Sequence, residues 1–202
     1  IPRVGDADVL VKVKNCGICG SDISYFYMWS PPDKMPIILG HEFTGEVVEV
    51  GAIPKSMGLF KPGDRVAIEP GYTCRKCHYC RTGHYNLCPD VVFMATPPVD
   101  GAFCEYVAWP EDFVFALPDS MSFEDGAMME PLSVGLWAVE RGQVRPGDAV
   151  AIYGSGPIGL VTLQAAKAAG ATTVISVDIE PYRLEHARRL GATHVVDASD
   201  GG

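Results

Sequence analysis

The chain has 202 residues, of which 48% are hydrophobic and 20% charged, and its formal net charge is −9. This is the composition of a globular protein with enough apolar residues for one large domain or two smaller ones, and it excludes a disordered chain. The acidic balance argues against nucleic acid or an anionic membrane as a partner, because both require a basic surface. No stretch approaches the roughly twenty apolar residues of a membrane span.

In chain order, the first two thirds of the sequence predict short strands. Val9, Val11 and Val13 alternate with other residues, and Gly and Pro separate the later apolar runs, which cover residues 45–50, 64–68 and 103–109. This pattern favours a compact, barrel-like β domain. A generic β-sandwich remains an alternative, because composition alone does not separate the two.

Four cysteines lie close together between two of these runs, in a C-x2-C-x2-C-x7-C pattern formed by Cys74, Cys77, Cys80 and Cys88. Four thiolates at such spacing suit a tetrahedral zinc ion with no open position, so the segment 74–88 predicts a structural zinc lobe. An iron–sulfur cluster is the rival interpretation. The seven cysteines are odd in number and clustered, which favours a reducing, cytoplasmic compartment over a secreted disulfide framework.

The pattern changes near Ser122, which with Asp125 predicts a capping box and a helix that runs to Gly142. Strands are then expected at 149–153, 173–178 and 194–197, and helices at 157–169 and 181–190. This alternation predicts right-handed βαβ crossovers and a parallel sheet. We therefore expect two domains, residues 1–125 and 126–202.

A G-x-G-x-x-G motif formed by Gly154, Gly156 and Gly159 follows the first of these strands and opens a helix. Glycines there permit a tight turn and a close approach of a pyrophosphate to the helix N-terminus. Asp178 ends the next strand, where a carboxylate binds a ribose and disfavours a 2′-phosphate, so NAD is preferred over NADP. The alternative is a glycine-rich turn with a solvated Asp178. Arg183 lies along the adenosine or is an exposed helix charge.

Two further segments and one isolated acid offer metal ligands: Cys16-x-x-Cys19, Gly40-His41-Glu42, and Glu130 in an apolar context. A mixed set of sulfur, nitrogen and oxygen ligands is typical of a zinc site with a free position. Cys16 and Cys19 are also compatible with a redox pair. Glu130 is costly to bury among methionines and leucines unless a cation compensates it.

These motifs occur in the order found in the zinc-dependent medium-chain dehydrogenases, which the chain resembles over essentially its whole length. Within that family, the runs 95–98 and 130–133 look most like sorbitol and xylitol dehydrogenases, which are polyol dehydrogenases. The resemblance implies an α/β fold, with a GroES-like β-barrel domain followed by a Rossmann NAD-binding domain.

The resemblance also implies roles for individual residues. A catalytic zinc would lie on Cys19 and His41, with Glu42 as third ligand and Glu130 either bound directly or holding the zinc water. Ser21 would pass the substrate proton outward. Further implied contacts are Tyr25 and Glu130 to substrate, and the motif glycines with Ile158, Asp178 and Arg183 to NAD. Ser24 stands where relatives usually carry a relay histidine. Apart from the resemblance, the aromatic cluster Tyr25, Phe26, Tyr27 and Trp29 is a candidate lining of a substrate cleft, and core packing explains Phe26 and Trp29 equally well.

The function implied is hydride transfer between a polyol or secondary alcohol and NAD, by a homo-oligomer when full length. Alternatives are a zinc dehydrogenase acting on threonine or a primary alcohol, and a non-catalytic zinc-stabilised binding domain. Only three Rossmann strands are expected here, so the resemblance implies truncation at both ends and weak cofactor binding by the isolated chain.

Overall fold

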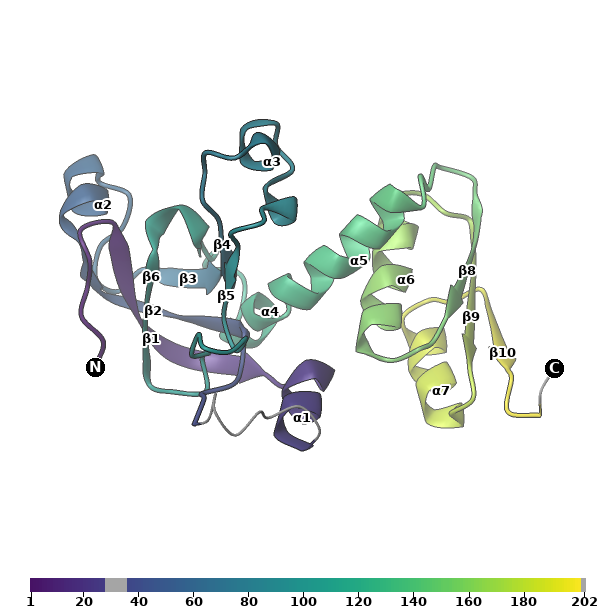
Figure 1. The fold of residues 1–202 in the computed structure, drawn as a ribbon. Helices are drawn as coiled ribbons and strands as arrows, with labels where there is room; N and C mark the ends of the chain where they lie inside the picture. Colours follow the sequence, from purple (N-terminus) through teal and green to yellow (C-terminus); the bar gives the residue numbers. More distant parts are fainter. Residues whose placement is uncertain (28–35, 201–202) are drawn as a thin grey trace. The chain divides into compact units, whose positions relative to one another are not determined.

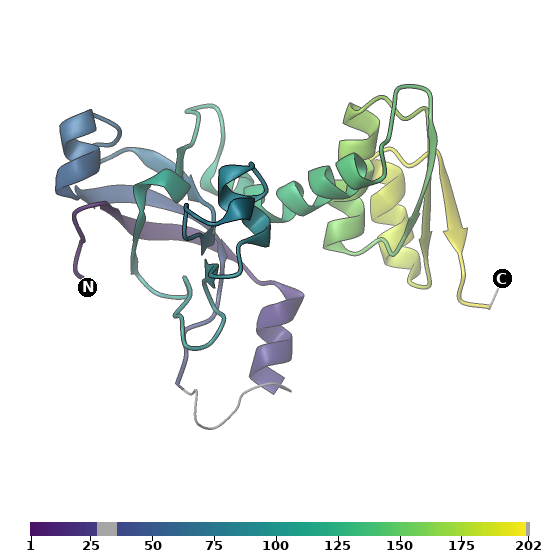
Figure 2. The ribbon, with the colours of Figure 1, turned by 45° about the horizontal axis from the view of Figure 1, so that its top comes forward.

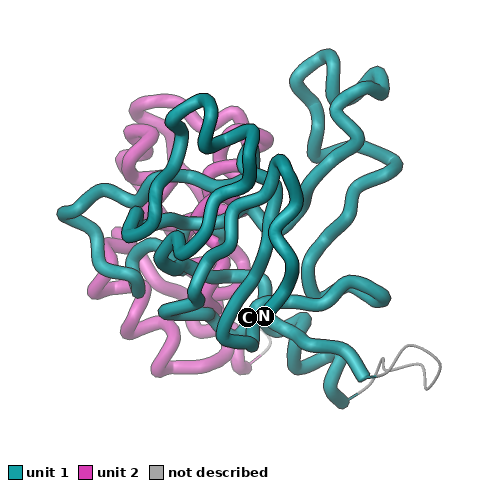
Figure 3. Tube along the Cα trace, turned by 90° about the vertical axis from the view of Figure 1, so that its left-hand side faces the viewer, with its two compact units in different colours: residues 1–130 teal, residues 131–202 magenta. Residues whose placement is uncertain are grey.

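The computed structural model describes residues 1–27 and 36–200. The chain divides into two compact units, Ile1–Glu130 and Pro131–Gly202 (Figure 3). Each unit has its own hydrophobic core. Within the described residues, no helix has the length and apolar character needed to cross a bilayer.

The first unit is built on a five-stranded antiparallel sheet that curls into a half-barrel (Figures 1 and 2). The strand order is β6-β1-β2-β3-β7. The strands are β1 Asp8–Gly17, β2 Glu42–Val50, β3 Arg65–Ile68, β6 Tyr106–Pro110 and β7 Val114–Ala116. Val9 and Val11 of β1 are fully buried with Val47 of β2, as expected for the barrel-like β domain. Leu10 between them is also buried, at 4% exposed, so the expected alternation appears only from Val11 onward.

Short elements complete the first unit. They are α1 Gly20–Tyr27, α2 Ala52–Met57, the strand pair β4 Gly71–Tyr72 and β5 Val92–Phe93, α3 His78–Arg81, η2 Tyr85–Leu87, η3 Glu111–Phe113 and α4 Phe123–Ala127. The strand expected at residues 103–109 begins later, at Tyr106. Residues 101–103 instead donate backbone hydrogen bonds to Ile38, Gly40 and Leu39, and thereby hold the loop that precedes His41.

The helix expected to run from the Ser122 capping box to Gly142 is two helices, α4 and α5 Met129–Arg141, with a break at Met128. The capping box itself is present, with Asp125 as its acid. Pro131 explains the break, because it has no N–H to donate to the carbonyl four residues earlier. The helical hydrogen-bond ladder therefore cannot continue across this point.

The second unit is a parallel three-stranded sheet in the order β10-β9-β8, which confirms the predicted crossovers. The strands β8 Ala149–Tyr153, β9 Thr173–Asp178 and β10 His194–Asp197 have the expected bounds. They alternate with α6 Pro157–Ala168 and α7 Pro181–Arg189. Leu163 of α6, Val174 of β9 and Ala187 of α7 meet in the core.

Candidate metal and dinucleotide sites

The first candidate site forms where β1 ends and β2 begins. These strands are antiparallel and pair Gly17 with Glu42 at their common end. Cys19 follows two residues after Gly17, immediately before α1, and therefore lies beside the start of β2. A side-chain carbon at Gly17 would overlap the Glu42 carboxylate, so glycine leaves the space that this carboxylate occupies.

The structure brings Cys19, His41 and Glu42 together. One ligand atom from each lies within 4.8 Å of the others. Around a tetrahedral zinc, sulfur and nitrogen ligands are about 3.5 Å apart. The three side chains therefore fit one ion after a small contraction, and they supply three ligands with a fourth position open. His41 is buried, at 6% exposed, and the other two are partly buried.

Asp22 organises this cluster through the backbone. It is only 4% exposed, and its carboxylate accepts hydrogen bonds from the backbone N–H of Cys19 and of Gly40, each at 2.9 Å. The same carboxylate lies 3.6 Å from His41 Nδ1, a buried atom with no hydrogen-bond partner among the described residues. An imidazole whose Nδ1 faces a carboxylate presents Nε2 as a metal ligand, so this arrangement also fits a bound ion.

Glu130 lies beside the cluster but not in it. Burial is the main cause that raises the pKa of its carboxyl, and the charge of His41 opposes that shift while the charge of Glu42 adds to it. These influences place Glu130 near both residues. Among the described residues, however, the set of ligand atoms within 4.8 Å contains Glu42 and not Glu130.

Cys16 does not join the cluster. Its thiol packs against the core of the half-barrel, and burial, followed by the charge of Asp22, raises its pKa to about 12. A thiol with so high a pKa is a poor nucleophile. This raised pKa disfavours the redox-pair interpretation of Cys16 and Cys19.

The remaining residues expected near the site lie on α1. Ser21 is exposed and Tyr25 is partly buried. Ser24 donates its hydroxyl hydrogen bond to the carbonyl of Gly20, at 3.0 Å. Phe26 and Tyr27 are 71% and 78% exposed, so neither belongs to the core of the first unit, and Trp29 falls outside the described residues.

The four-cysteine lobe gathers its thiols as predicted. One sulfur from each of Cys74, Cys77, Cys80 and Cys88 lies within 4.8 Å of the others. Backbone N–H groups point at these sulfurs, for example Cys77 N at 3.3 Å from Cys74 Sγ. Such bonds favour thiolates, and those from Lys76 and Cys77 lower the pKa of Cys74 to about 7. The backbone N–H of Cys80 favours the Cys77 thiolate in the same way, but burial and the neighbouring thiols outweigh it and raise the pKa of Cys77 to about 11. Four cysteine sulfurs gathered at this distance fit a structural zinc.

Two side-chain contacts attach this lobe to the half-barrel. Arg75 donates two hydrogen bonds to Asp112, at 2.5 and 2.6 Å, and the hydroxyl of Tyr85 donates to Glu69 at 3.2 Å. A bidentate pair of this kind fixes orientation as well as distance. The lobe, which contains α3, therefore has a defined place on the first unit (Figure 1).

The second candidate site is the glycine loop between β8 and α6. Gly154 has a φ of 94°, which other residues avoid, and a side chain at Gly159 would overlap the carbonyl oxygen of Gly154. Gly156 is the N-cap of α6 and offers no side chain to its first N–H groups. These groups point out of an uncapped helix start, where an anion binds.

Asp178 ends β9 beside this loop. Its carboxylate accepts hydrogen bonds from Ser155 N at 2.6 Å and from Glu180 N at 2.9 Å. The bond from Ser155 is the largest cause that lowers the pKa of Asp178. Arg183 approaches within 3.8 Å of the same carboxylate, and Ile158 is 43% exposed at the start of α6.

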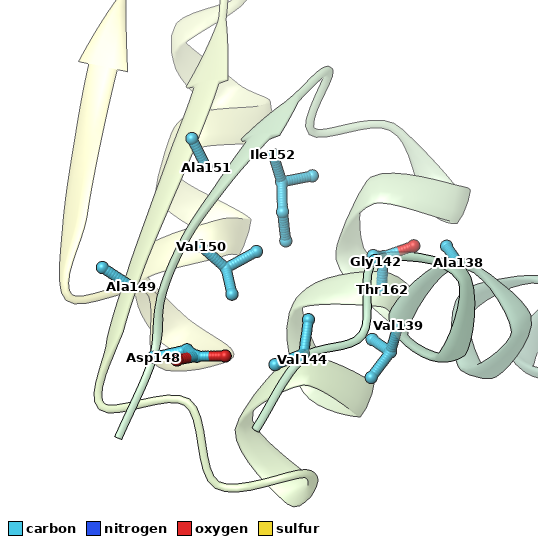
Figure 4. A pocket seen from close by; sticks show the side chains of 10 residues that line it. All are labelled: Ala138, Val139, Gly142, Val144, Asp148, Ala149, Val150, Ala151, Ile152 and Thr162. Atoms are coloured by element: carbon cyan, nitrogen blue, oxygen red, sulfur yellow. The ribbon is translucent and has the colours of Figure 1, made fainter. Parts of the chain in front are cut away.

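A separate apolar cavity of 430 Å³ lies between α5, β8 and α6 in the second unit (Figure 4). Val150 and Ile152 line it from β8, and Val139 lines it from α5. The residues that line it include neither the motif glycines nor Asp178. The cavity is therefore distinct from the phosphate loop.

Two features of these sites do not emerge from the sequence patterns. The first is the role of Asp22, although an acid three residues after Cys19 can reach back to the backbone N–H at a helix start, and that spacing is a usable signal. The second is a buried contact between Ser155 and Ser176, which no spacing rule would reveal.

A half-barrel with a candidate metal-ligand set and a parallel sheet with a glycine loop are typical of metal-dependent dehydrogenases. Comparison with known families agrees. Residues 5–119 match the family described as Alcohol dehydrogenase GroES-like domain, and residues 157–201 match Zinc-binding dehydrogenase. The chain therefore belongs to the zinc-binding alcohol dehydrogenase family with a GroES-like domain.

Within this family, the chain is similar to several individual proteins. Sorbitol dehydrogenase of Bacillus subtilis is 50% identical to this chain, and the match covers 98% of this chain and 56% of the relative. A probable D-xylulose reductase A of Arthroderma otae is 48% identical, and the match covers 96% of this chain and 55% of the relative. A zinc-binding dehydrogenase of Sinorhizobium meliloti, solved bound to NADP, superposes with a TM-score of 0.90 at 40% identity, covering 100% of this chain and 57% of that one. The chain thus spans about half the length of the curated relatives it matches.

Proposed function

We propose that this chain belongs to a zinc-dependent oxidoreductase that transfers a hydride between a polyol or secondary alcohol and NAD. The observation that carries the proposal is the meeting of Cys19, His41 and Glu42 beside the buried Asp22, in a chain that also holds a glycine loop ending at α6. The identity to sorbitol dehydrogenase supports the polyol class. The proposed roles are a catalytic domain at residues 1–125 and a cofactor-binding segment at residues 126–202.

Different residues of the first unit would bind the metal, orient the substrate and transfer the proton. Cys19, His41 and Glu42 would hold a zinc ion, which supplies a Lewis acid that lowers the pKa of a hydroxyl group. Glu130 and Tyr25 would orient the substrate, and Ser21, exposed on α1, would accept its hydroxyl proton and pass it to solvent. The lobe at residues 74–88 would hold a second, structural zinc.

The second unit would bind the cofactor, which supplies the hydride acceptor. The free N–H groups at the start of α6 would take the pyrophosphate, and Ile158 would lie along the dinucleotide. Asp178 would accept hydrogen bonds from the adenosine ribose, with Arg183 beside it. A carboxylate there repels a 2′-phosphate, which favours NAD over NADP. We also propose a cytoplasmic homo-oligomer.

The test is NAD-linked activity of the complete protein across sorbitol, xylitol, threonine and ethanol. We expect NADH formation with the polyols, and turnover with ethanol or threonine alone would refute the substrate class. Cys19→Ala should abolish turnover while sparing NAD binding. Cys16→Ala is the matched control, because that thiol lies three residues away and outside the ligand cluster. Turnover that survives Cys19→Ala would refute the catalytic zinc.

A further inference from the structure

Two serine hydroxyls meet in the interior of the second unit. Ser155 and Ser176 are both 0% exposed, and their Oγ atoms lie 3.0 Å apart. Ser155 is the second residue of the glycine loop. Ser176 lies in β9, paired with Ile152 of β8 and with Val195 of β10.

Ser176 is an unexpected residue for this place. It faces the same side of β9 as Val174, which is fully buried in the core, and its neighbours Ile175 and Val177 are aliphatic. A buried hydroxyl is costly unless it is hydrogen-bonded, and an aliphatic residue would suit a central strand better. Ser176 has such a partner in Ser155, and a residue that departs from the local pattern in this way points to a functional requirement.

The hydroxyl pair is one of three contacts that tie the glycine loop to β9. Ser155 stands between Gly154 and Gly156, and glycine permits many backbone conformations. Two backbone bonds tie the loop to the end of β9, from Gly154 N to Val177 O at 2.8 Å and from Ser155 N to the Asp178 carboxylate at 2.6 Å. The hydroxyl pair is the only one of these three bonds that anchors a side chain of the loop in the core.

The position of Ser155 in the core sets the direction of the backbone N–H groups that follow it. Gly156 follows directly as the N-cap of α6, and Pro157 at the first helical position has no N–H. The N–H groups available to an anion are therefore those of Gly156, Ile158 and Gly159. A shift of Ser155 away from Ser176 would turn the Gly156 N–H and change how these groups converge.

We propose that Ser155 and Ser176 are positioning residues for the dinucleotide, whose hydroxyl pair holds the glycine loop in the geometry that receives a pyrophosphate. The inference rests on the proposed cofactor-binding function. Positioning of this kind affects cofactor binding in the ground state and the transition state alike. It therefore changes the KM for NAD and leaves kcat nearly unchanged.

The first test is Ser176→Ala in the complete protein, with NADH affinity measured by fluorescence titration and stability by thermal unfolding. The dissociation constant for NADH and the KM for NAD should rise roughly 5- to 10-fold, while kcat stays within about twofold. The matched control is Thr193→Val. The Thr193 hydroxyl accepts from Val174 N at 2.8 Å and donates to Val174 O at 2.9 Å, near the opposite end of β9.

Thr193→Val should lower the melting temperature without weakening NADH binding. The double variant Ser155→Ala with Ser176→Ala leaves no buried hydroxyl unpaired, so its melting temperature should recover toward that of the wild type. Its NADH affinity should remain low, because the loop is still unanchored. This separation of stability from affinity is what a merely structural pair would not produce.

Three results would overturn the inference. They are wild-type NADH affinity in Ser176→Ala, an equal loss in Thr193→Val, and recovery of affinity together with stability in the double variant. If the wild-type protein itself binds no NADH, the proposed function of the second unit fails and the inference fails with it. If the wild type binds NADH and Ser176→Ala binds equally well, only the inference fails.

Discussion

Asp22 is the residue whose replacement tests the organisation of the candidate metal site most severely. It touches the backbone of both Cys19 and Gly40, and Gly40 immediately precedes His41. Asp22→Ala would remove these two bonds and the carboxylate that faces His41 Nδ1 at 3.6 Å. The three ligand side chains would remain in the sequence but would lose their common support.

The magnitude follows from the two hydrogen bonds that the substitution removes. Hydrogen bonds to a charged acceptor are each worth about 1.5–3 kcal/mol, and part of that loss is offset because a buried carboxylate is also costly to desolvate. We therefore expect the free energy of unfolding to fall by about 2–4 kcal/mol. Loss of a supporting carboxylate typically weakens metal binding by about 10- to 100-fold.

The assay is zinc content after dialysis against a mild chelator, together with urea unfolding of the same preparation. Asp22→Ala should lose one zinc ion and keep the ion of the four-cysteine lobe. Asp64→Ala is the matched control, since its carboxylate accepts an equivalent bond from Lys61 N at 2.9 Å in an exposed turn. Asp22→Ala with wild-type zinc retention would refute the reasoning.

Three further predictions concern the lobe and the glycine loop. Cys88→Ser replaces a proposed zinc ligand that is only 4% exposed, so it should release the lobe zinc and lower the melting temperature. Metal analysis and calorimetry measure these two effects, and an unchanged zinc content would contradict the prediction. Gly159→Ala should weaken NADH binding strongly, because the added carbon would overlap the Gly154 carbonyl oxygen. Wild-type affinity in a calorimetric titration would show that the close contact between Gly154 and Gly159 is not required. The lowered pKa of Asp178 contributes stability that is present above the unfolded value of about 3.9 and is lost as pH falls through the folded pKa. The free energy of unfolding of Asp178→Asn, measured in urea, should therefore differ most from that of the wild type near neutral pH and approach it in acid. A difference that grows as the pH falls would contradict this prediction.

Much of the fold follows from local patterns. The three strands of the parallel sheet have the expected bounds because each is a short apolar run closed by Gly or by a polar residue. The Ser122 capping box was equally predictable. The break at Met128 was not expected, although Pro131 indicates it, because the apolar period continues unbroken across the proline.

The candidate site was only partly predictable. Spacing along the chain identified the four cysteines as one cluster, because all lie within a single lobe. Residues 19 and 41 are far apart in sequence, and only the β1–β2 register brings them together. Only side-chain distances, which no sequence pattern contains, favour Glu42 over Glu130 as the third ligand. The roles of Asp22 and Ser176 depend on burial and on contacts to backbone or to distant side chains, which spacing does not reveal.

The central claim is that Cys19, His41 and Glu42 bind one zinc ion. Anomalous diffraction at the zinc edge from crystals of the complete protein tests it most directly. We expect two peaks for each chain, one within the four-cysteine lobe and one within about 2.3 Å of Cys19 Sγ. A peak at the lobe alone, from protein prepared with zinc, would contradict the account.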